Sequence, residues 1–339
     1  MRKSILLSLL CCCIWILLLL GSCTNSTPIT SSPTEDSDVQ QSGKEDAIYE
    51  RMFVVGVSWQ GVTPYGNRMK TLLIKFAEEA DYEIRFIWMD GENNAEKQIS
   101  QIENFIAHKV DLILLNPCSY YDLGSAVNAA NDAGIPLITM ITRVYEQERC
   151  TSFVGSDHKE SALVQGTMVN DYLKQRGTIA ILEGTVGIDA QLSRSEGYKQ
   201  VLGQNPMLEV IASQPAFWEQ DEAYVIVENW IHNGICPDVI MSQSDSMALG
   251  ALEAVTEAGL EKQIRVFGID GDREAVQSVR DGGMEGTVFQ DAYSQIKYVF
   301  QCFDIIRNGG VPEKEYLVPF IALNKDNIDD EKIQSKLQY

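Results

Sequence analysis

The sequence has few positive charges and few histidines, and no two cysteines or histidines stand at a spacing typical of metal sites. Lysine and arginine together number 27, against 48 aspartates and glutamates, which gives a formal net charge of -21. We therefore expect no nucleic-acid partner, because phosphate backbones bind basic surfaces. The three histidines and eight cysteines form neither C-x-x-C nor H-E-x-x-H, so no metal site is expected.

Motifs for nucleotide binding and for nucleophilic catalysis are also missing. No G-x-x-x-x-G-K-[ST] occurs, and residues 268–272 (GIDGD) do not make G-x-G-x-x-G, so we expect no nucleotide and no other cofactor. The nucleophile motif G-x-S-x-G is absent too. We predict that the chain is not an enzyme. The enzymatic alternative is a glycosidase that uses Asp245 and Asp270 as its two carboxylates.

The amino terminus indicates export. Arg2 and Lys3 precede an apolar run over residues 5–20, which predicts a signal peptide over residues 1–22. A leucine, two small residues and Cys23 follow and resemble the bacterial lipobox, so we expect cleavage before Cys23 and a lipid on its thiol. The alternative is an uncleaved anchor, although the run is shorter than the ~20 residues of a spanning helix.

Residues 23–50 are polar and contain almost no large apolar side chain, so they are expected to form a flexible tether rather than part of a core. The mature protein would then be extracytoplasmic and attached to a bacterial membrane through the lipid. Four cysteines remain in the rest of the chain: Cys118, Cys150, Cys236 and Cys302. One disulfide among them and burial as small apolar residues are both open.

From residue 51 onward, apolar strands alternate with helical patterns. Strands are expected over residues 52–57, 83–89, 111–115, 136–141, 178–182, 208–213, 238–241, 264–269 and 285–289. Helices are expected over 65–80, around 99–106, and over 121–133, 158–175, 189–202, 221–233, 245–258, 273–280 and 294–308. This rhythm restarts after Gly155 and predicts an α/β fold of two doubly wound parallel-sheet lobes.

Polar and aromatic residues follow the carboxyl ends of the predicted strands, where α/β sheets bind ligands. The candidates are Ser58, Trp59, Tyr65, Thr142, Arg143, Arg194, Trp218, Ser244, Asp270 and Gln290. Carboxylates, amides and guanidinium groups suit hydroxyls that both donate and accept, and aromatic rings suit the C–H face of a sugar. The alternatives are structural: a surface arginine at 143, an Arg194 pair with Glu183 or Glu196, a core tryptophan at 218, and helix capping by Asp245.

Several stretches, in order, resemble the ribose/galactose-type periplasmic binding proteins, which are the solute receptors of ABC sugar importers. They are residues 242–252 (SQSDSMALGAL), 266–271 (VFGIDG) and 286–290 (GTVFQ), with 113–117, 133–136, 154–157 and 194–198 in agreement. The resemblance implies the type I fold, in which a three-segment hinge crosses between the lobes near Ser156, Asp291 and Pro319. It implies an N-terminal lobe of residues 51–156 plus 291–319 and a C-terminal lobe of 157–290 plus 320–339.

The resemblance also implies roles for single residues. Arg143 and Arg194 match two ligand-binding arginines, Trp218 the aromatic that stacks on the sugar, and Asp270 and Gln290 a carboxylate and an amide ligand. Tyr65 would supply a second stacking ring. Two positions depart from the family's pattern: Ser244 stands where asparagine is usual, and Thr142 where aspartate or asparagine is frequent. A ligand other than ribose is therefore expected.

The resulting hypothesis is a lipid-anchored receptor that binds a monosaccharide or sugar-like molecule between two lobes and delivers it to an ABC permease. One alternative is a sensor that presents its closed form to a histidine kinase or a chemoreceptor. Another is a structural surface lipoprotein whose cleft binds nothing.

Overall fold

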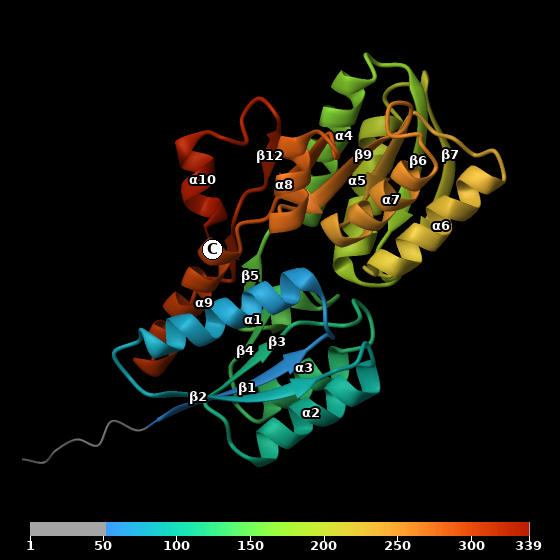
Figure 1. The fold of residues 1–339 in the computed structure, drawn as a ribbon. Coiled ribbons are helices and arrows are strands. Elements are labelled where there is room, and N and C mark those ends of the chain that lie inside the picture. The colour runs from blue at the N-terminus through green and yellow to red at the C-terminus, as the bar shows by residue number, and fades with distance from the viewer. Residues whose placement is uncertain (1–51, 339) are drawn as a thin grey trace, which may run out of the picture. The chain divides into compact units, whose positions relative to one another are not determined.

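A computed structural model describes residues 52–338 (Figure 1). The predicted signal peptide, the lipidation site Cys23 and the tether lie outside the described residues. Two six-stranded sheets form, with the strand orders β11-β5-β4-β3-β1-β2 and β12-β10-β9-β8-β6-β7. All neighbouring strands pair in parallel except β10 and β12, which are antiparallel. The two doubly wound parallel-sheet lobes predicted from the sequence are confirmed.

The N-terminal lobe is built on the first of these sheets. Its strands are β1 (Phe53–Trp59), β2 (Ile84–Asp90), β3 (Leu112–Leu115), β4 (Leu137–Ile141), β5 (Ser152–Gly155) and β11 (Glu315–Leu317). Its helices are α1 (Pro64–Glu78), α2 (Ala95–Ala107), α3 (Gly124–Asp132), the short 3-10 helix η1 (Gln147–Arg149) and α9 (Ala292–Arg307). Apolar side chains of α1 and α9 cover one face of the sheet, and those of α2 and α3 cover the other.

The C-terminal lobe repeats this arrangement. Its strands are β6 (Gly177–Glu183), β7 (Leu208–Pro215), β8 (Val239–Ser242), β9 (Arg265–Asp270), β10 (Gly286–Phe289) and β12 (Ile321–Asn324). Its helices are α4 (His158–Tyr172), α5 (Asp189–Leu202), α6 (Gln220–His232), α7 (Asp245–Glu257), α8 (Arg273–Asp281) and α10 (Glu331–Leu337). Helices α6, α7 and α8 pack on one face, and α4 and α5 on the other.

The chain passes between the two sheets three times. The connections are residues 156–157 between β5 and α4, residues 290–291 between β10 and α9, and residues 318–320 between β11 and β12. Residues in or next to them are in contact: the Gln295 side-chain nitrogen donates to the Ser156 hydroxyl at 2.9 Å, and the ring centroids of His158 and Phe320 lie 6.1 Å apart. The three connections therefore meet in one small region.

Five short elements were not predicted from the sequence: β5, η1, β11, β12 and α10. Strand β11 has three residues, none of which is buried, so no apolar pattern marks it. Strand β12 joins the edge of its sheet by antiparallel pairing. The alternation of strands and helices in the sequence does not predict an antiparallel strand. For the three strands among them, pairing with strands elsewhere in the sheet contributes more than local composition.

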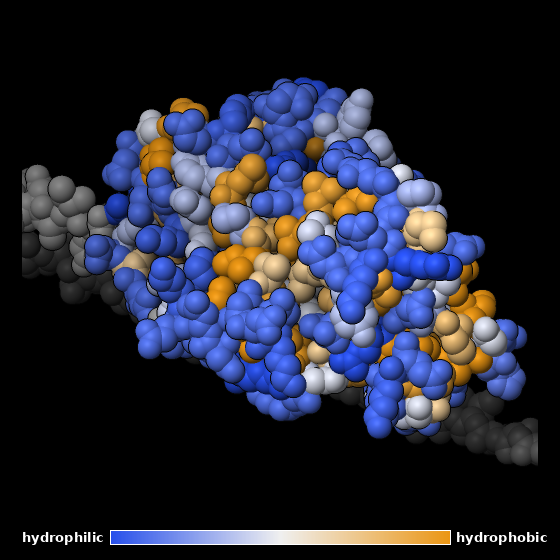
Figure 2. Space-filling view, turned by 90° about the horizontal axis from the view of Figure 1, so that it is seen from above, coloured by the Kyte–Doolittle hydropathy of each residue, from blue (hydrophilic) through white to orange (hydrophobic). Residues whose placement is uncertain are grey.

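The face of the protein seen in Figure 2 is mainly hydrophilic, and most of the described cysteines are buried. Hydrophilic residues cover most of the face seen in Figure 2, with hydrophobic residues in small groups between them. Cys118, Cys150 and Cys302 are buried, Cys236 is exposed, and none of these four is in a disulfide. Between residues 52 and 338, no helix combines the length and the apolar character needed to cross a membrane.

Gly250 tests the packing of α6 against α7. A Cβ at this position would lie 2.1 Å from the backbone carbonyl oxygen of Gln220, which cannot rotate away as a side chain can. We expect Gly250→Ala to lower the free energy of unfolding by about 1–3 kcal/mol, measured by urea denaturation. The control is Gly124→Ala, where the nearest atom would be the flexible Glu146 carboxylate at 3.4 Å. Equal effects of the two substitutions would contradict close packing at Gly250.

Candidate functional site

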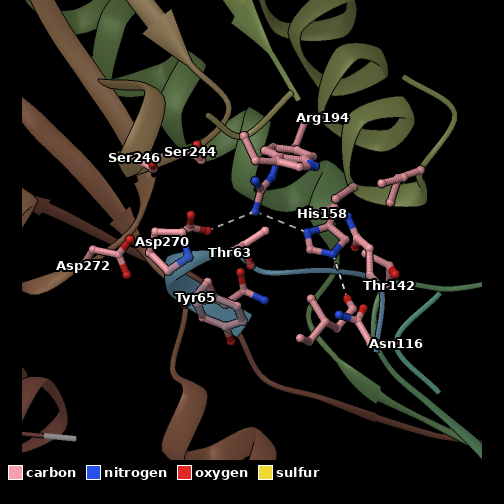
Figure 3. Close-up of a pocket in the computed structure, with 17 residues that line it drawn as sticks. Thr63, Tyr65, Asn116, Thr142, His158, Arg194, Ser244, Ser246, Asp270 and Asp272 are labelled. Carbon is pink, nitrogen blue, oxygen red and sulfur yellow. Dashed lines mark hydrogen bonds and ion pairs between the residues drawn. The ribbon is translucent and has the colours of Figure 1, made fainter. Parts of the chain in front are cut away.

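A cavity lies where the carboxyl ends of strands from both sheets meet (Figure 3). Its empty space, counted out to the mouth, is about 560 Å³. Both lobes line it: Gln60, Thr63, Pro64, Tyr65, Asn116, Ile141 and Thr142 from the N-terminal lobe, and His158, Ile188, Ala190, Arg194, Trp218, Ser244, Ser246, Asp270, Asp272 and Gln290 from the C-terminal lobe and its connections. This is the position at which open α/β sheets bind ligands.

Seven of the ten residues predicted to bind ligand line this cavity. They are Tyr65, Thr142, Arg194, Trp218, Ser244, Asp270 and Gln290. Most lie at a strand end or in the loop that follows one, where parallel pairing brings residues distant in the sequence to a common edge. The strand-end pattern in the sequence therefore located seven of the seventeen lining residues.

Three of the ten predicted residues, Ser58, Trp59 and Arg143, do not line this cavity. The Ser58 hydroxyl donates to the Gln101 side-chain oxygen at 2.7 Å within the core. Trp59 packs edge-on against the ring of Trp88, with centroids 6.0 Å apart. They are the last two residues of β1, and their side chains point to the two opposite faces of the sheet rather than beyond its end.

The Arg143 side chain turns toward β5 and β11. Its guanidinium group pairs with the Glu315 carboxylate at 3.2 Å and lies 4.0 Å from the ring centroid of Phe153. Its backbone contacts the C-terminal lobe, because the Arg143 N–H donates to the Asp189 carboxylate at 3.0 Å. Because the Arg143 side chain is long, its guanidinium group can lie far from its Cα atom. The position of Arg143 after β4 therefore does not determine where its charge lies.

Arg194 is held by its own lobe and faces the cavity (Figure 3). Its side chain is 3% exposed and donates to the Ser161 hydroxyl at 3.2 Å and to the Gln243 carbonyl oxygen. The same guanidinium group lies 3.6 Å from the Asp270 carboxylate. The surface pair with Glu196 is wrong, because Glu196 binds Lys159 at 2.6 Å.

The turn at the start of α7 is organised differently from the capping alternative. Ser244, not Asp245, is the N-cap, and its hydroxyl accepts from the Met247 N–H at 3.3 Å. The fully buried Asp245 carboxylate accepts from the Asp272 N–H at 2.8 Å and from the Thr287 hydroxyl at 2.6 Å. Burial first, and then the Asp272 carboxylate, raise the pKa of Asp245 to about 7. Asp245 thus supports the loop after β9 from behind and does not line the cavity.

The loop after β9 is also held from the N-terminal lobe. Arg68 on α1 donates to the carbonyl oxygens of Asp270 and Gly271 at 3.2 and 3.1 Å, and it pairs with the Asp272 carboxylate at 3.2 Å. Asp270 has a φ of 128°, which residues other than glycine rarely adopt. Burial raises the pKa of Asp270 and the nearby Arg194 opposes that shift.

Trp218 forms the flat apolar part of the wall. A Cβ at Gly184 would lie 1.9 Å from its ring, so the indole rests directly on the Gly184 backbone. The guanidinium carbon of Arg194 is 5.8 Å from the ring centroid. The core-tryptophan alternative describes it incompletely, because the half-buried ring packs beside the apolar core and also lines the cavity.

Three buried polar atoms of the lining have no hydrogen-bond partner within residues 52–338. They are the Tyr65 hydroxyl, the Asn116 side-chain oxygen and the Gln290 side-chain nitrogen. Leaving such an atom unpaired costs about 1–3 kcal/mol, and native proteins rarely tolerate it. Together, these three atoms offer the cavity both hydrogen-bond donors and hydrogen-bond acceptors.

Sequence reasoning missed several lining residues, of which His158 and Asn116 matter most. Asn116 directly follows β3, so the strand-end pattern could have found it. His158 is the first residue of α4 and is 1% exposed. The sequence predicts it as the first residue of a helix, and only the meeting of the three connections brings it to the cavity wall.

The fold and the cavity agree with comparisons to known proteins. The periplasmic binding protein domain family matches residues 53–308. The xylitol-binding protein of Mycolicibacterium smegmatis is 31% identical over 247 residues, which are 73% of this chain and 70% of that protein. The ribose import binding protein of Bacillus subtilis is 28% identical over 304 residues, which are 89% of this chain and 94% of that protein.

Solved structures show the same two-lobed type I fold. An ABC transporter solute-binding protein from Bacillus halodurans with bound myo-inositol has a TM-score of 0.79 and 31% identity, covering 84% of this chain and 98% of that one. These relatives are solute-binding proteins and not enzymes, so the glycosidase alternative is not supported. The resemblance seen in the sequence is confirmed, and the chain belongs to the periplasmic binding protein family.

Proposed function

We propose that the chain binds a monosaccharide or a similarly hydroxylated small molecule in the cavity and delivers it to an ABC importer. The observation that supports this most is the set of unpaired polar atoms on Tyr65, Asn116 and Gln290. A carbonyl-type oxygen, an amide nitrogen and a hydroxyl together need a ligand that both donates and accepts, as neighbouring hydroxyl groups do.

The charges of the lining favour a neutral ligand. Arg194 faces Asp270, and Arg68 pairs with Asp272, so the cavity offers no unopposed charge to an ionic ligand. Trp218 supplies a flat surface for the C–H face of a ring or chain. Xylitol, ribose and myo-inositol, named for three relatives, are all neutral and rich in hydroxyls.

Two lining residues argue for a ligand other than ribose. The Thr142 hydroxyl donates to the Pro117 carbonyl oxygen at 3.3 Å, and the Ser244 hydroxyl accepts the N–H of Met247. Both short groups are partly occupied within the protein, so they bind a ligand hydroxyl less strongly than the longer side chains usual in the family would. A sensory role is the weaker alternative, because the named relatives include import binding proteins.

We further propose how the molecule is organised in the cell. Residues 1–22 are removed, Cys23 carries the lipid, and residues 24–50 tether the two lobes to the membrane. The N-terminal lobe comprises residues 51–156 and 291–319, and the C-terminal lobe comprises 157–290 and 320–339. Ligand bound between them stabilises the closed form, which the permease recognises.

Calorimetry tests the proposed function. The purified chain without its first 22 residues is titrated with ribose, allose, glucose, galactose, xylitol and myo-inositol, with serine as a negative control. We expect at least one of the hydroxylated compounds to bind at micromolar concentration or tighter and to raise the melting temperature. Absence of heat and of thermal stabilisation for a broad carbohydrate panel would contradict the proposal.

Gln290→Leu separates binding from folding. The substitution removes the unpaired amide nitrogen at similar volume, so the free energy of unfolding of the unliganded protein should stay equal or rise. Affinity for the ligand should fall tenfold or more, which is about 1.4 kcal/mol. Arg143→Ala is the control and should change affinity less than threefold, since this arginine lies outside the cavity. A larger loss of affinity in Arg143→Ala than in Gln290→Leu would contradict the assignment of the site.

Cys23→Ser tests the membrane anchor. When the full chain is expressed in a bacterium with labelled palmitate, we expect the label on the wild-type protein and its partition into the detergent phase. The serine variant should carry no label, because the thiol that accepts the lipid is gone, while its ligand affinity stays unchanged. Labelling of the variant would place the lipid elsewhere and contradict the proposed anchor.

A further inference from the structure

His158 lies at the point where the three connections between the lobes meet. It follows the first connection, and its ring packs against Phe320 of the third at 6.1 Å. Gln295, near the start of α9 after the second connection, donates to Ser156 beside it. The side chain is 1% exposed and lines the cavity. A residue in this place experiences any change in the angle between the lobes.

The two ring nitrogens of His158 contact different lobes (Figure 3). Nε2 lies 2.8 Å from the carbonyl oxygen of Ile141, the last residue of β4 in the N-terminal lobe. A carbonyl only accepts, so Nε2 carries the proton. Nδ1 lies 3.4 Å from Nη2 of Arg194, and a guanidinium group only donates, so Nδ1 is the acceptor. The neutral tautomer protonated on Nε2 is the one that satisfies both contacts.

The surroundings keep this ring neutral. Arg194 faces it from α5, Arg143 lies beyond the end of β4, and Asp157 precedes it at the N-cap of α4. Burial first, and then the charge of Arg194, lower the pKa of His158 to about 3. An imidazolium ring would also direct a second N–H at the guanidinium group. The ring therefore remains an acceptor toward Arg194 at physiological pH.

The partner carbonyl in the N-terminal lobe belongs to a strained turn. Ile141 has a φ of 69°, which a β-branched side chain rarely adopts. The Thr142 N–H donates to the Met140 carbonyl oxygen at 2.8 Å, which closes a tight γ-turn around Ile141. Strained backbone of this kind persists only where surrounding contacts hold it, and it is concentrated at ligand sites and switch regions. His158 is one of those contacts.

We infer that His158 is a positioning residue that couples the relative position of the two lobes to Arg194, the cationic side chain on the cavity wall. The Ile141 turn orients the ring, and the other ring nitrogen holds the guanidinium group toward the ligand. This inference rests on the proposed function, because it takes Arg194 as a ligand-binding residue. It assigns to His158 a role distinct from direct contact with the ligand.

Three substitutions separate the two contacts. His158→Asn places an amide oxygen near Nδ1, so the acceptor for Arg194 is kept and the bond to Ile141 is lost. His158→Gln can place its amide nitrogen near Nε2, so the bond to Ile141 is kept and the acceptor is lost. His158→Phe keeps an aromatic ring but loses both the bond to Ile141 and the acceptor for Arg194. Affinity is measured by calorimetry with the best ligand of the panel, and closure by the change in small-angle scattering on saturation.

We expect the asparagine and glutamine variants to bind at least fivefold more weakly than wild type, and the phenylalanine variant to bind more weakly than either. Combining His158→Phe with Arg194→Lys should cost less than the product of the single effects, because both act through one contact. Combining His158→Phe with Gln290→Leu should be multiplicative and serves as the control. If the phenylalanine variant does not fold, the asparagine and glutamine pair carries the test.

Nitrogen NMR of the imidazole ring provides a readout that does not need the ligand. We expect the Nε2-protonated neutral form from pH 8 down to pH 5. A ring protonated on Nδ1, or a charged ring above pH 5, would overturn the inference. So would wild-type affinity in His158→Phe, or multiplicative effects with Arg194→Lys. If wild type binds no compound of the panel, the proposed function fails, and the NMR result still decides the state of the ring.

Discussion

Parallel strand pairing is the constraint on which the site depends. Within each sheet, parallel neighbours end at the same edge, so the residues that follow them are brought together regardless of their distance in the sequence. Asn116, Thr142, Ser244, Asp270 and Gln290 come from five such ends. Helices on both faces of each sheet bury the strands, which leaves the strand ends as the place where polar side chains can gather.

The cavity combines fixed charges with unpaired neutral groups. Arg194 is held by the Gln243 carbonyl oxygen and the Ser161 hydroxyl, and the loop bearing Asp270 is held by the buried Asp245. These contacts lie within the protein and fix the direction of the charged side chains, and side chains that are already ordered cost little free energy to immobilise on binding. The unpaired atoms contribute differently, because a molecule that supplies their missing partners gains hydrogen bonds there.

The two lobes are linked through the site as well as through their connections. Arg68 of α1 holds the loop after β9, and the Arg143 backbone contacts Asp189 at the start of α5. His158 adds a contact between the turn at Ile141 and Arg194. Hydrogen bonds between the lobes are therefore made by residues that line the cavity or lie beside it.

Local periodicity and the strand-end rule determined much of this protein from sequence alone, including the α/β lobes and the lining role of Tyr65, Asp270 and Gln290. They failed for Ser58 and Trp59, whose side chains follow the faces of β1, and for Arg143, whose long side chain pairs with Glu315. The sequence by itself determined which residues stand at strand ends, because the apolar run that marks a strand is a local pattern of the sequence. Only the tertiary structure decided that Asp245 supports a neighbouring loop and that His158 joins the two lobes, because these contacts depend on partners far away along the chain.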